Sequence, residues 1–210
     1  MDSEGTSIKA FTAALASSSP VPGGGGASAL AGALAAALCS MAANLTVGKP
    51  RYASVEDDMI RIAGRCSELS AELTGLIDKD AEAFIPLAGA YSISKADPER
   101  EKAIAEASIN ACSAVCMVLT CCCEVTELLE DTLEKCSPMM ISDVGCGALL
   151  CNAALKAAAM NVFVNTKALR GAPRADMIEK RVYMMLNEYG PRTEKISSAV
   201  MQQLTGGANG

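Results

Sequence analysis

Asp80 is the side chain of this sequence best placed to carry acid–base chemistry. The chain contains no histidine, so proton transfer near neutral pH falls to carboxylate, lysine, cysteine or tyrosine side chains. Ile77, Ala81 and Phe84 form the apolar stripe of the surrounding segment, and Asp80 sits beside it. Burial there would raise the pKa of the carboxyl toward a range useful for catalysis. The same pattern also fits a solvated helix face that Asp80 shares with the neighbouring carboxylates.

Asn161 and Asn165 form a second polar pair, in a segment that is otherwise apolar. They lie one helical turn apart, so both amides should point the same way. A buried amide pair destabilises a fold unless a partner or a ligand satisfies it, and two amides can donate and accept along the edge of a planar heterocycle. The alternative is a hydrogen-bonded pair between helices, in the core or at a dimer contact. The pattern leaves both interpretations open.

A glycine run, Gly23 to Gly26, follows two prolines and leads directly into the small-residue segment 27–43. Glycines let a ligand approach the backbone closely, and the N–H groups at a helix start can hold an anion or a polar edge. The stretch from Pro20 to Gly26 is therefore a candidate ligand loop. No Lys-Ser or Lys-Thr follows, as a phosphate-binding P-loop would require, and the alternative is an ordinary turn before a helix.

The charge of the chain limits its partners. The net charge is −6 and the isoelectric point is near 4.8, and no basic face is concentrated for nucleic acid. An anionic small ligand would need a local cluster of cations, and Lys49 with Arg51 forms one directly after the small-residue segment. We expect a small-molecule ligand and no nucleic-acid partner.

Ten cysteines are present, without a histidine or a Cys-x-x-Cys pair. Cys112 and Cys116 lie one helical turn apart and Cys121 to Cys123 are consecutive, so a metal site has to be considered. Consecutive residues of a helix point in different directions, however, and a free cysteine packs as a small apolar side chain. We expect buried, reduced thiols and no metal.

The N-terminal residues Met1 to Glu4 are acidic and carry no apolar signal core, which predicts a cytoplasmic protein. Segment 27–47 is uncharged and is about long enough to cross a bilayer. It consists mainly of alanine, glycine and serine, with no isoleucine or phenylalanine, so its tendency to insert should be weak. A buried core helix and no membrane association are expected.

The composition predicts an all-α protein. Half of the residues are hydrophobic but only 3% are aromatic, and small side chains at this density suit closely packed helices. Pro86 should kink or break one long helix, and short loops between long helices predict an antiparallel up-and-down bundle. Apolar periodicity and capping residues predict helices over residues 8–17, 27–46, 56–84, 99–135, 143–169 and 175–204.

We expect residues 1–210 to form one domain, because a chain of this length can enclose a single sizeable core. The segment 27–46 is apolar nearly all round, which marks it as a central helix enclosed by the others. Uncharged surfaces on more than one of the expected helices also predict a homodimer.

Five separated motifs together resemble the cyclodeaminase/cyclohydrolase family, and the resemblance covers nearly the whole chain. It implies an all-helical homodimer that binds a tetrahydrofolate derivative without a metal or a nucleotide. In chain order the motifs are Pro22-Gly23-Gly24-Gly25, Asn44 to Lys49, Asp78 to Phe84, Ser142-Asp143 and Asn161 to Asn165.

That family includes two folate activities. Its cyclodeaminases close N5-formimino-tetrahydrofolate to 5,10-methenyl-tetrahydrofolate and release ammonia, whereas its methenyltetrahydrofolate cyclohydrolases interconvert the methenyl and 10-formyl forms with water. Both reactions pass through a tetrahedral carbon between N5 and N10, so one site could serve either. These residues hold no formiminotransferase segment, which favours the cyclohydrolase. A non-catalytic folate-binding helical protein is the remaining alternative.

The resemblance also assigns roles to residues at matching positions. Asp80 resembles the family's proposed acid–base aspartate, and Gly23 to Gly25 resemble its folate-contacting loop. Lys49 would meet the folate carboxylates as a cation. The remaining polar residues of the pocket would be Asp143, Asn161 and Asn165.

One position departs from the family pattern. The family commonly has serine after its three glycines, whereas this chain has Gly26. The change removes a side-chain cap from the helix start, together with a candidate ligand contact. Ser28 is the nearby residue that could replace it.

Overall fold

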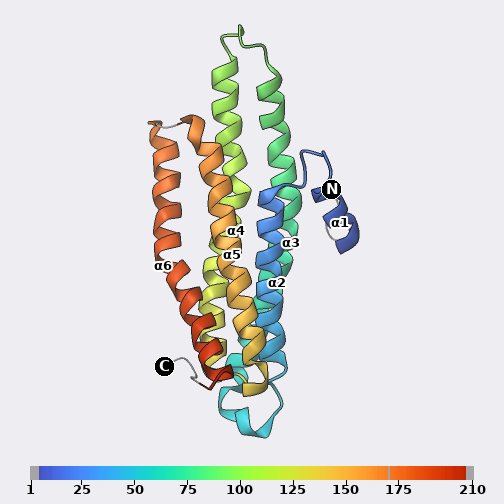
Figure 1. Ribbon diagram of the computed structural model, residues 1–210, viewed down its shortest axis with the longest axis vertical. Coiled ribbons are helices and arrows are strands. Elements are labelled where there is room, and N and C mark those ends of the chain that lie inside the picture. The colour runs from blue at the N-terminus through green and yellow to red at the C-terminus, as the bar shows by residue number, and fades with distance from the viewer. Residues whose placement is uncertain (1–4, 170, 207–210) are drawn as a thin grey trace.

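The computed structural model describes residues 5–169 and 171–206, and within them the chain forms a bundle of long helices without strands (Figure 1). The described elements are all helices, so the predicted all-α class is confirmed. The long helices run alternately down and up the bundle in chain order. Residues 1–4, on which the expected cytoplasmic location was argued, lie outside the described residues. The long helices are α2 (Gly24–Asn44), α3 (Glu56–Ser92), α4 (Arg100–Lys135), α5 (Ile141–Thr166) and α6 (Pro173–Leu204).

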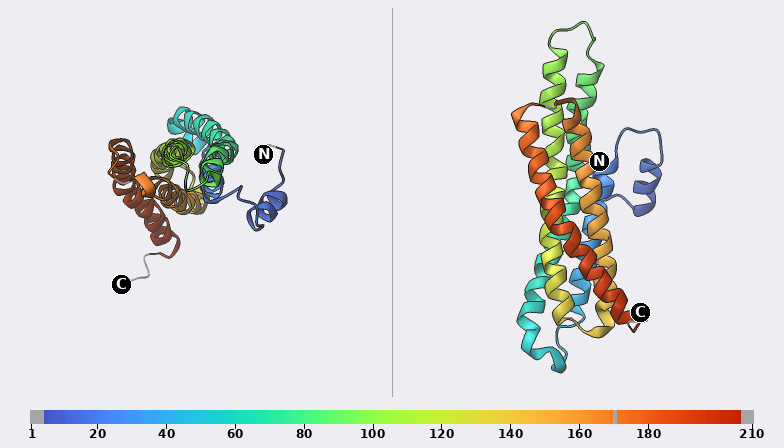
Figure 2. Two further views of the ribbon diagram at one scale, coloured as in Figure 1. Left: turned by 90° about the horizontal axis from the view of Figure 1, so that it is seen from above. Right: turned by 60° about the vertical axis from the view of Figure 1, so that its left-hand side comes forward.

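The short helix α1 (Ile8–Leu15) lies beside the bundle, as the view from above shows (Figure 2). Ser7 caps it, because the Ser7 hydroxyl accepts a hydrogen bond from the Ala10 N–H at 3.2 Å. Phe11 is buried and packs against the core. The helix was predicted from the sequence over residues 8–17, and it ends two residues earlier, at Leu15.

Helix α2 begins at Gly24, three residues before its predicted start, so Gly24, Gly25 and Gly26 form its first turn. Gly23 is the N-cap residue and offers no side chain to the free N–H groups of that turn. The prediction of a glycine loop that ends before the helix is therefore wrong. Glycine lowers helix propensity by about 1 kcal/mol relative to alanine, but contacts with α3 and α5 outweigh that preference here.

A kink or a break of α3 was predicted at Pro86; the break does not occur, because the helix continues to Ser92. Pro86 is exposed, so the carbonyl group four residues earlier, which loses its helical N–H partner, can be hydrated. The other helix boundaries differ from the predicted ones by a few residues. Short 3-10 helices occupy three connections: η1 (Pro50–Val55), η2 (Pro138–Met140) and η3 (Lys167–Leu169).

The core lies where α3, α4 and α5 pack against α2. Helices α3 and α4 supply large buried side chains such as Leu69, Leu76 and Leu129, whereas α2 contributes mainly alanines. These short side chains let neighbouring helices approach α2 closely. A Cβ atom on Gly32 would lie only 3.0 Å from the Cys122 sulfur. Helix α2 therefore packs against three neighbours, as predicted for a core helix, but it is not enclosed on all sides, because Leu34 and Met41 remain exposed.

All ten cysteines are free, and eight of them are buried. Cys116 is partly buried and Cys146 is exposed. Buried thiols such as those of Cys66 and Cys122 pack among apolar side chains, in agreement with the predicted packing role. Within the described ranges, no three histidine, cysteine, aspartate or glutamate side chains gather into a group that could hold a metal ion.

Three helical segments are long and apolar enough to cross a membrane, judged by length and composition: α2, α4 and residues Pro138–Thr166. In the bundle, 61%, 67% and 44% of their most apolar windows are buried. Most of the apolar surface of α2 and α4 is therefore used in packing between helices. The segment that contains α5 keeps more of its apolar surface exposed than the other two.

Candidate active site

The carboxylate of Asp80 rests against the first turn of α2. Asp80 belongs to α3, and its Oδ2 accepts a hydrogen bond from the Gly26 N–H at 2.9 Å, across 54 residues of sequence. The N–H groups of a first helical turn have no partner within the helix and carry the positive end of its dipole, so they stabilise a nearby carboxylate. The glycine run thus binds a side chain of the protein itself, a contact that the sequence did not indicate.

Glycine is required at position 25 for this contact. A Cβ atom on Gly25 would lie 2.1 Å from Asp80 Oδ1 and 2.4 Å from the carboxyl carbon, far inside van der Waals distance. On Gly24, a Cβ atom would lie 3.0 Å from Asn161 Nδ2 and 3.1 Å from its Oδ1. The backbone of α2 reaches both side chains because these two residues have no side chain of their own.

Burial raises the pKa of the Asp80 carboxyl above its ordinary value, and the hydrogen bond from the Gly26 backbone opposes part of that rise. Asp80 is partly buried, so the structure favours the buried interpretation of its sequence pattern over a fully solvated face. A raised pKa brings the carboxyl closer to the pH range in which it can both accept and return a proton.

Asn161 and Asn165 approach the same place from α5. Asn161 Nδ2 donates a hydrogen bond to the Ala157 carbonyl at 2.8 Å, so its own helix holds one side of this amide. The same amide faces the first turn of α2 at Gly24. Among the described residues, no hydrogen bond joins the Asn161 and Asn165 amides to each other or to another helix. The interhelical pair considered from the sequence is therefore not formed in this chain.

A cavity of about 220 Å³ opens between the start of α2 and the facing sides of α3, α4 and α5. Asp80 is the one titratable side chain among the described residues that line it. Six of the eleven described lining residues are among the site residues selected from the sequence. The selected residues that meet here are Gly23, Gly24, Gly25, Asp80, Asn161 and Asn165.

The apolar walls of this cavity were not selected as contacts from the sequence. They come from Pro20, Val21, Phe84, Ala111 and Val164. Phe84 could have been found, because it lies one turn after Asp80 on the same helix side. Ala111 and Val164 carry no such signal, since only the packing of α4 and α5 decides which side of each helix faces α2.

Lys49 and Asp143 are not brought to this cavity within one chain. Helix α2 has 21 residues and is therefore about 30 Å long, and Lys49 follows its far end. Asp143 lies in the first turn of α5, about 27 Å along the helix axis from Asn161. The end of α2 and the start of α5, next to which these residues lie, are together at one end of the bundle, away from the start of α2 (Figure 1). The sequence could not show this, because it does not specify which helix ends meet.

Gly26 leaves room for the serine that the family pattern would place there. A Cβ atom on Gly26 would lie 3.4 Å from Ile77 Cγ2 and 3.9 Å from Asp80 Oδ2, which are ordinary contact distances. Ser28 does not replace that serine, because its buried hydroxyl donates to the Gly25 carbonyl at 2.6 Å. The start of α2 is therefore capped from outside, by Asp80.

This arrangement can hold a flat polar ligand and move protons at its edge. The backbone of Gly23 to Gly25 presents a surface free of side chains, while Phe84 and Val164 offer apolar faces. Asp80 can take a proton from water or from a nitrogen atom and return it. Proton-assisted addition to, or elimination from, a carbon of the ligand is the chemistry that these groups support.

Comparison with known proteins gives a consistent result. The family model described as formiminotransferase-cyclodeaminase matches residues 7–184. The chain is 41% identical over 202 residues to the methenyltetrahydrofolate cyclohydrolase of Methylorubrum extorquens, covering 94% of this chain and 97% of that protein. It is 29% identical over 194 residues to the formimidoyltransferase-cyclodeaminase of Rattus norvegicus, covering 87% of this chain but 34% of that protein.

A solved structure agrees with the described fold. The crystal structure of formiminotetrahydrofolate cyclodeaminase from Thermotoga maritima is similar with a TM-score of 0.82 and 30% sequence identity. The likeness covers 97% of this chain and 98% of that one. The sequence and fold comparisons therefore both match cyclodeaminase relatives.

Proposed function

The chain belongs to the formiminotransferase-cyclodeaminase family, and on this premise we propose that it is a 5,10-methenyltetrahydrofolate cyclohydrolase. The observation that carries the proposal is the position of Asp80, partly buried at a cavity whose other described walls are glycine backbone, amides and apolar side chains. The choice of the hydrolase follows the Methylorubrum relative, which matches over nearly the full length of both chains.

In the proposed reaction, ionised Asp80 accepts a proton from the water molecule that attacks the methenyl carbon. The attack forms a C–O bond and gives a tetrahedral carbon bonded to both N5 and N10. Asp80 then returns its proton to N5 as the bond between N5 and this carbon breaks. The hydroxyl proton passes to solvent as the C=O bond forms, so the products are 10-formyl-tetrahydrofolate and one proton.

The other cavity residues orient the folate for this step. Asn161 and Asn165 each offer a donor and an acceptor, which suits the polar edge of a pterin ring. Gly23 to Gly25 let the flat ring lie close to the backbone of α2, and Phe84 covers one of its faces. The glycine run thus has two roles in the proposed reaction: it holds the Asp80 carboxylate in place, and it supports the pterin ring.

A second activity, formiminotetrahydrofolate cyclodeaminase, is favoured by the solved Thermotoga relative, which is similar over nearly the whole of both chains. There N10 attacks the formimino carbon, and Asp80 carries the N10 proton to the amine. With one further proton from solvent, ammonia leaves and the methenyl bridge forms. Both reactions use the same tetrahedral carbon and the same carboxyl group.

Offering the purified protein each folate separately tests the assignment. The absorbance of the methenyl chromophore should fall when 5,10-methenyl-tetrahydrofolate is supplied, at a rate above the spontaneous hydrolysis. A rise of that absorbance from 5-formimino-tetrahydrofolate, without acceleration of methenyl hydrolysis, would favour the cyclodeaminase instead. Tight folate binding with neither reaction would contradict both and leave a non-catalytic folate-binding protein.

We also propose that two copies of the chain pair through the outer faces of α2 and α5. Large apolar side chains remain exposed there, among them those of Leu34 and Met41 on α2 and of Leu149 on α5. Met160 and Val164 of α5 are 67% and 71% exposed. Exposed apolar surface of this kind marks interaction sites. Val164 also lines the Asp80 cavity, so a partner on this face would extend the cavity wall.

Pairing of this kind also gives Lys49 and Asp143 a place in the site. The cavity of about 220 Å³ is smaller than typical small-molecule sites, which measure roughly 300–1,000 Å³. A folate therefore extends beyond it. A two-fold axis across the helices would put the far end of α2 of one copy beside the cavity of the other. Lys49 and Asp143 of the second copy would then complete the site at the carboxylate end of the folate.

Exchange of Met160 for glutamate tests the interface. Sedimentation should show a dimer for the wild-type chain and a folded monomer with reduced activity for Met160→Glu, because a charge is introduced into the apolar face. Met184→Glu is the matched control, since Met184 is 63% exposed on α6 and should leave the dimer intact. A wild-type chain that sediments as a monomer at micromolar concentration would contradict the proposal.

We further propose that this reaction uses neither a metal ion nor a nucleic acid and takes place in the cytoplasm. A reaction without a metal ion is supported by the donor set, because the described ranges contain no group of three metal-binding side chains. A reaction without nucleic acid is supported by the isoelectric point near 4.8. The cytoplasmic location is supported by the ten free cysteines, since free thiols suit a reducing compartment.

A further inference from the structure

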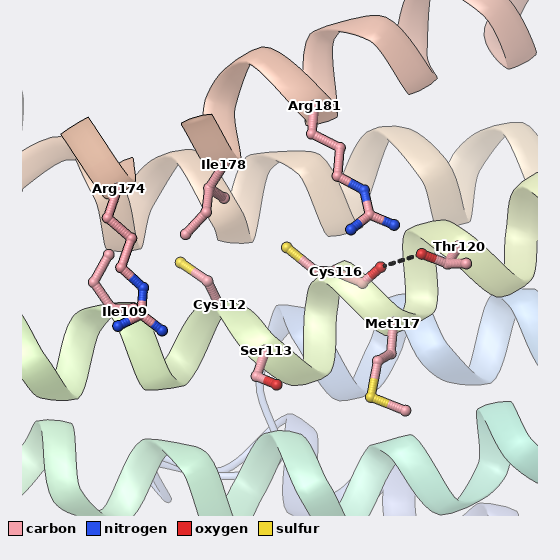
Figure 3. A pocket seen from close by; sticks show the side chains of 9 residues that line it. All are labelled: Ile109, Cys112, Ser113, Cys116, Met117, Thr120, Arg174, Ile178 and Arg181. Atoms are coloured by element: carbon pink, nitrogen blue, oxygen red, sulfur yellow. Dashed lines mark hydrogen bonds between the residues drawn. The ribbon is translucent and has the colours of Figure 1, made fainter. Parts of the chain in front are cut away.

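A second cavity, of about 390 Å³, lies between α4 and α6 and shares no lining residue with the Asp80 cavity. Arg174, Ile178 and Arg181 line it from α6. Figure 3 shows both arginine side chains extending from α6 across the cavity toward α4, with Ile178 between them. The facing surface of α4 includes Ile109 and Ser113. The cavity is open to solvent, since both arginines are exposed.

The two arginines differ from others on the outside of the bundle. Arg61, Arg65 and Arg192 each form ion pairs with carboxylates, at distances between 2.6 and 3.8 Å. In the part of the chain that the structure describes, no carboxylate lies within ion-pair distance of Arg174 or Arg181. Among the described residues, none of those that line the cavity is acidic either. No ion pair among the described residues therefore neutralises either guanidinium group, although the Glu179 carboxylate of α6 lies near enough to Cys112 to raise the pKa of that thiol.

The remaining polar groups of the lining do not supply that partner. Burial raises the pKa of the Cys112 thiol to about 12 and also raises that of the Cys116 thiol, so both stay neutral at physiological pH. The Thr120 hydroxyl donates to the Cys116 carbonyl at 3.0 Å and is held by its own helix (Figure 3). Both guanidinium groups are therefore available to bind an anion from outside the chain.

The spacing of the arginines indicates the shape of that anion. Arg174 and Arg181 are seven residues apart and therefore lie on the same side of α6, about 10 Å apart along its axis. Ile178 lies between them, and Ile109 faces it from α4. The cavity thus presents a positive group, an apolar middle and a second positive group. A single phosphate would meet one guanidinium group, whereas a molecule charged at both ends would meet both.

We propose that the cavity between α4 and α6 binds a small organic dicarboxylate, with one carboxylate on Arg174, the other on Arg181 and its hydrocarbon chain against Ile109 and Ile178. Guanidinium groups bind carboxylates through paired hydrogen bonds, which makes arginine the suitable residue for such a ligand. This site is independent of the proposed folate reaction, because the Asp80 cavity uses none of its residues.

Calorimetric titration with suberate, an eight-carbon dicarboxylate, tests the proposal on the whole protein. Suberate should bind the wild-type chain, and octanoate, with one carboxylate, should bind at least about tenfold more weakly. Arg174→Gln and Arg181→Gln should each weaken suberate binding about tenfold, and the double variant should abolish it. Lys180→Gln is the matched control, because it removes one charge from α6 outside the lining.

Three results would overturn the proposal. The first is no binding of suberate to the wild-type chain, and the second is undiminished binding to the double variant. The third is binding of inorganic phosphate as tightly as suberate, because that would indicate a site for one anion. The basal folate reaction of the double variant should equal that of the wild type, and its circular dichroism should confirm that the bundle is folded.

Discussion

Helices α2 and α5 both carry glycine near their N-terminal ends, at positions where no other side chain would fit. A Cβ atom on Gly25 of α2 would lie 2.1 Å from Asp80 Oδ1, and one on Gly145 of α5 would lie 2.7 Å from Val200 Cγ1. The steric requirement is the same, but the neighbour is a carboxylate in one case and a buried apolar side chain in the other. Glycine serves the site in α2 and the packing of the core in α5.

The position within each helix explains this difference. The first-turn N–H groups of α2 have no partner in the helix, so a carboxylate close to the backbone can accept from one of them, as Asp80 does from Gly26. Gly145 is the fifth residue of α5, where the N–H already bonds within the helix. Close approach alone therefore does not make a site. The side chain also has to approach the helix where backbone N–H groups are still free to donate hydrogen bonds.

The largest expected effect is that of alanine at the two glycines. Gly25→Ala should lower kcat/KM about 100-fold or more, because its Cβ displaces the Asp80 carboxylate from its position. Gly145→Ala should leave activity within about twofold, and overpacking against Val200 should lower the free energy of unfolding by about 1–3 kcal/mol. The methenyl absorbance assay and urea unfolding measure the two quantities. A fully active Gly25→Ala variant would remove the distinction between the helices.

A smaller effect is expected at Asn161. Asn161→Ala should lower kcat/KM about tenfold, because the ring loses one hydrogen-bonding partner. Asn152 of the same helix is the control, since its amide donates to Glu194 at 3.3 Å on the outside of the bundle. Asn152→Ala should leave kcat/KM unchanged within about twofold. Equal losses in both variants would indicate that the polar side chains of α5 act through helix stability alone.

The smallest effect is a displacement of the pH profile at Gly26. Activity should fall at low pH as Asp80 becomes protonated, since the carboxylate is the proton acceptor. Gly26→Ser places a hydroxyl near Asp80 Oδ2, and a donor to the charged form lowers the pKa of the carboxyl. The acid limb of kcat/KM should move to lower pH in Gly26→Ser and stay in place in Gly26→Ala. A limb that moves equally in both variants would show that the added Cβ, and not the hydroxyl, is responsible.

Much of the fold and part of the site could be predicted from the sequence. Apolar periodicity predicted the long helices, and the low content of aromatic residues predicted the all-α class. Asp80, Asn161 and the glycines could be selected because unusual residue types stand out in apolar helices and because their motifs resemble a known family. Such signals depend only on residues that are close together in the sequence, so they can be recognised without knowledge of the fold.

The rest depends on which surfaces meet. The α2 boundary was placed too late, because a helix that begins with three glycines gains its stability from Asp80 and from packing rather than from propensity. Lys49 and Asp143 were assigned to the same pocket as Asp80, although a helix length separates them within one chain. Arg174 and Arg181 gave no signal at all, since their lack of carboxylate partners is visible only when α4 and α6 are placed together.

Asp80→Asn, followed for activity and stability together, tests the central claim most directly. The asparagine oxygen can still accept from the Gly26 N–H, but it cannot take a proton, so kcat should fall about 100-fold or more while folate affinity is kept. Burial raises the folded-state pKa of Asp80, so ionisation of this group destabilises the fold as the pH rises through that pKa. The variant should therefore be at least as stable as the wild type at neutral pH. An unchanged kcat, or a loss of activity that merely follows unfolding, would contradict the account.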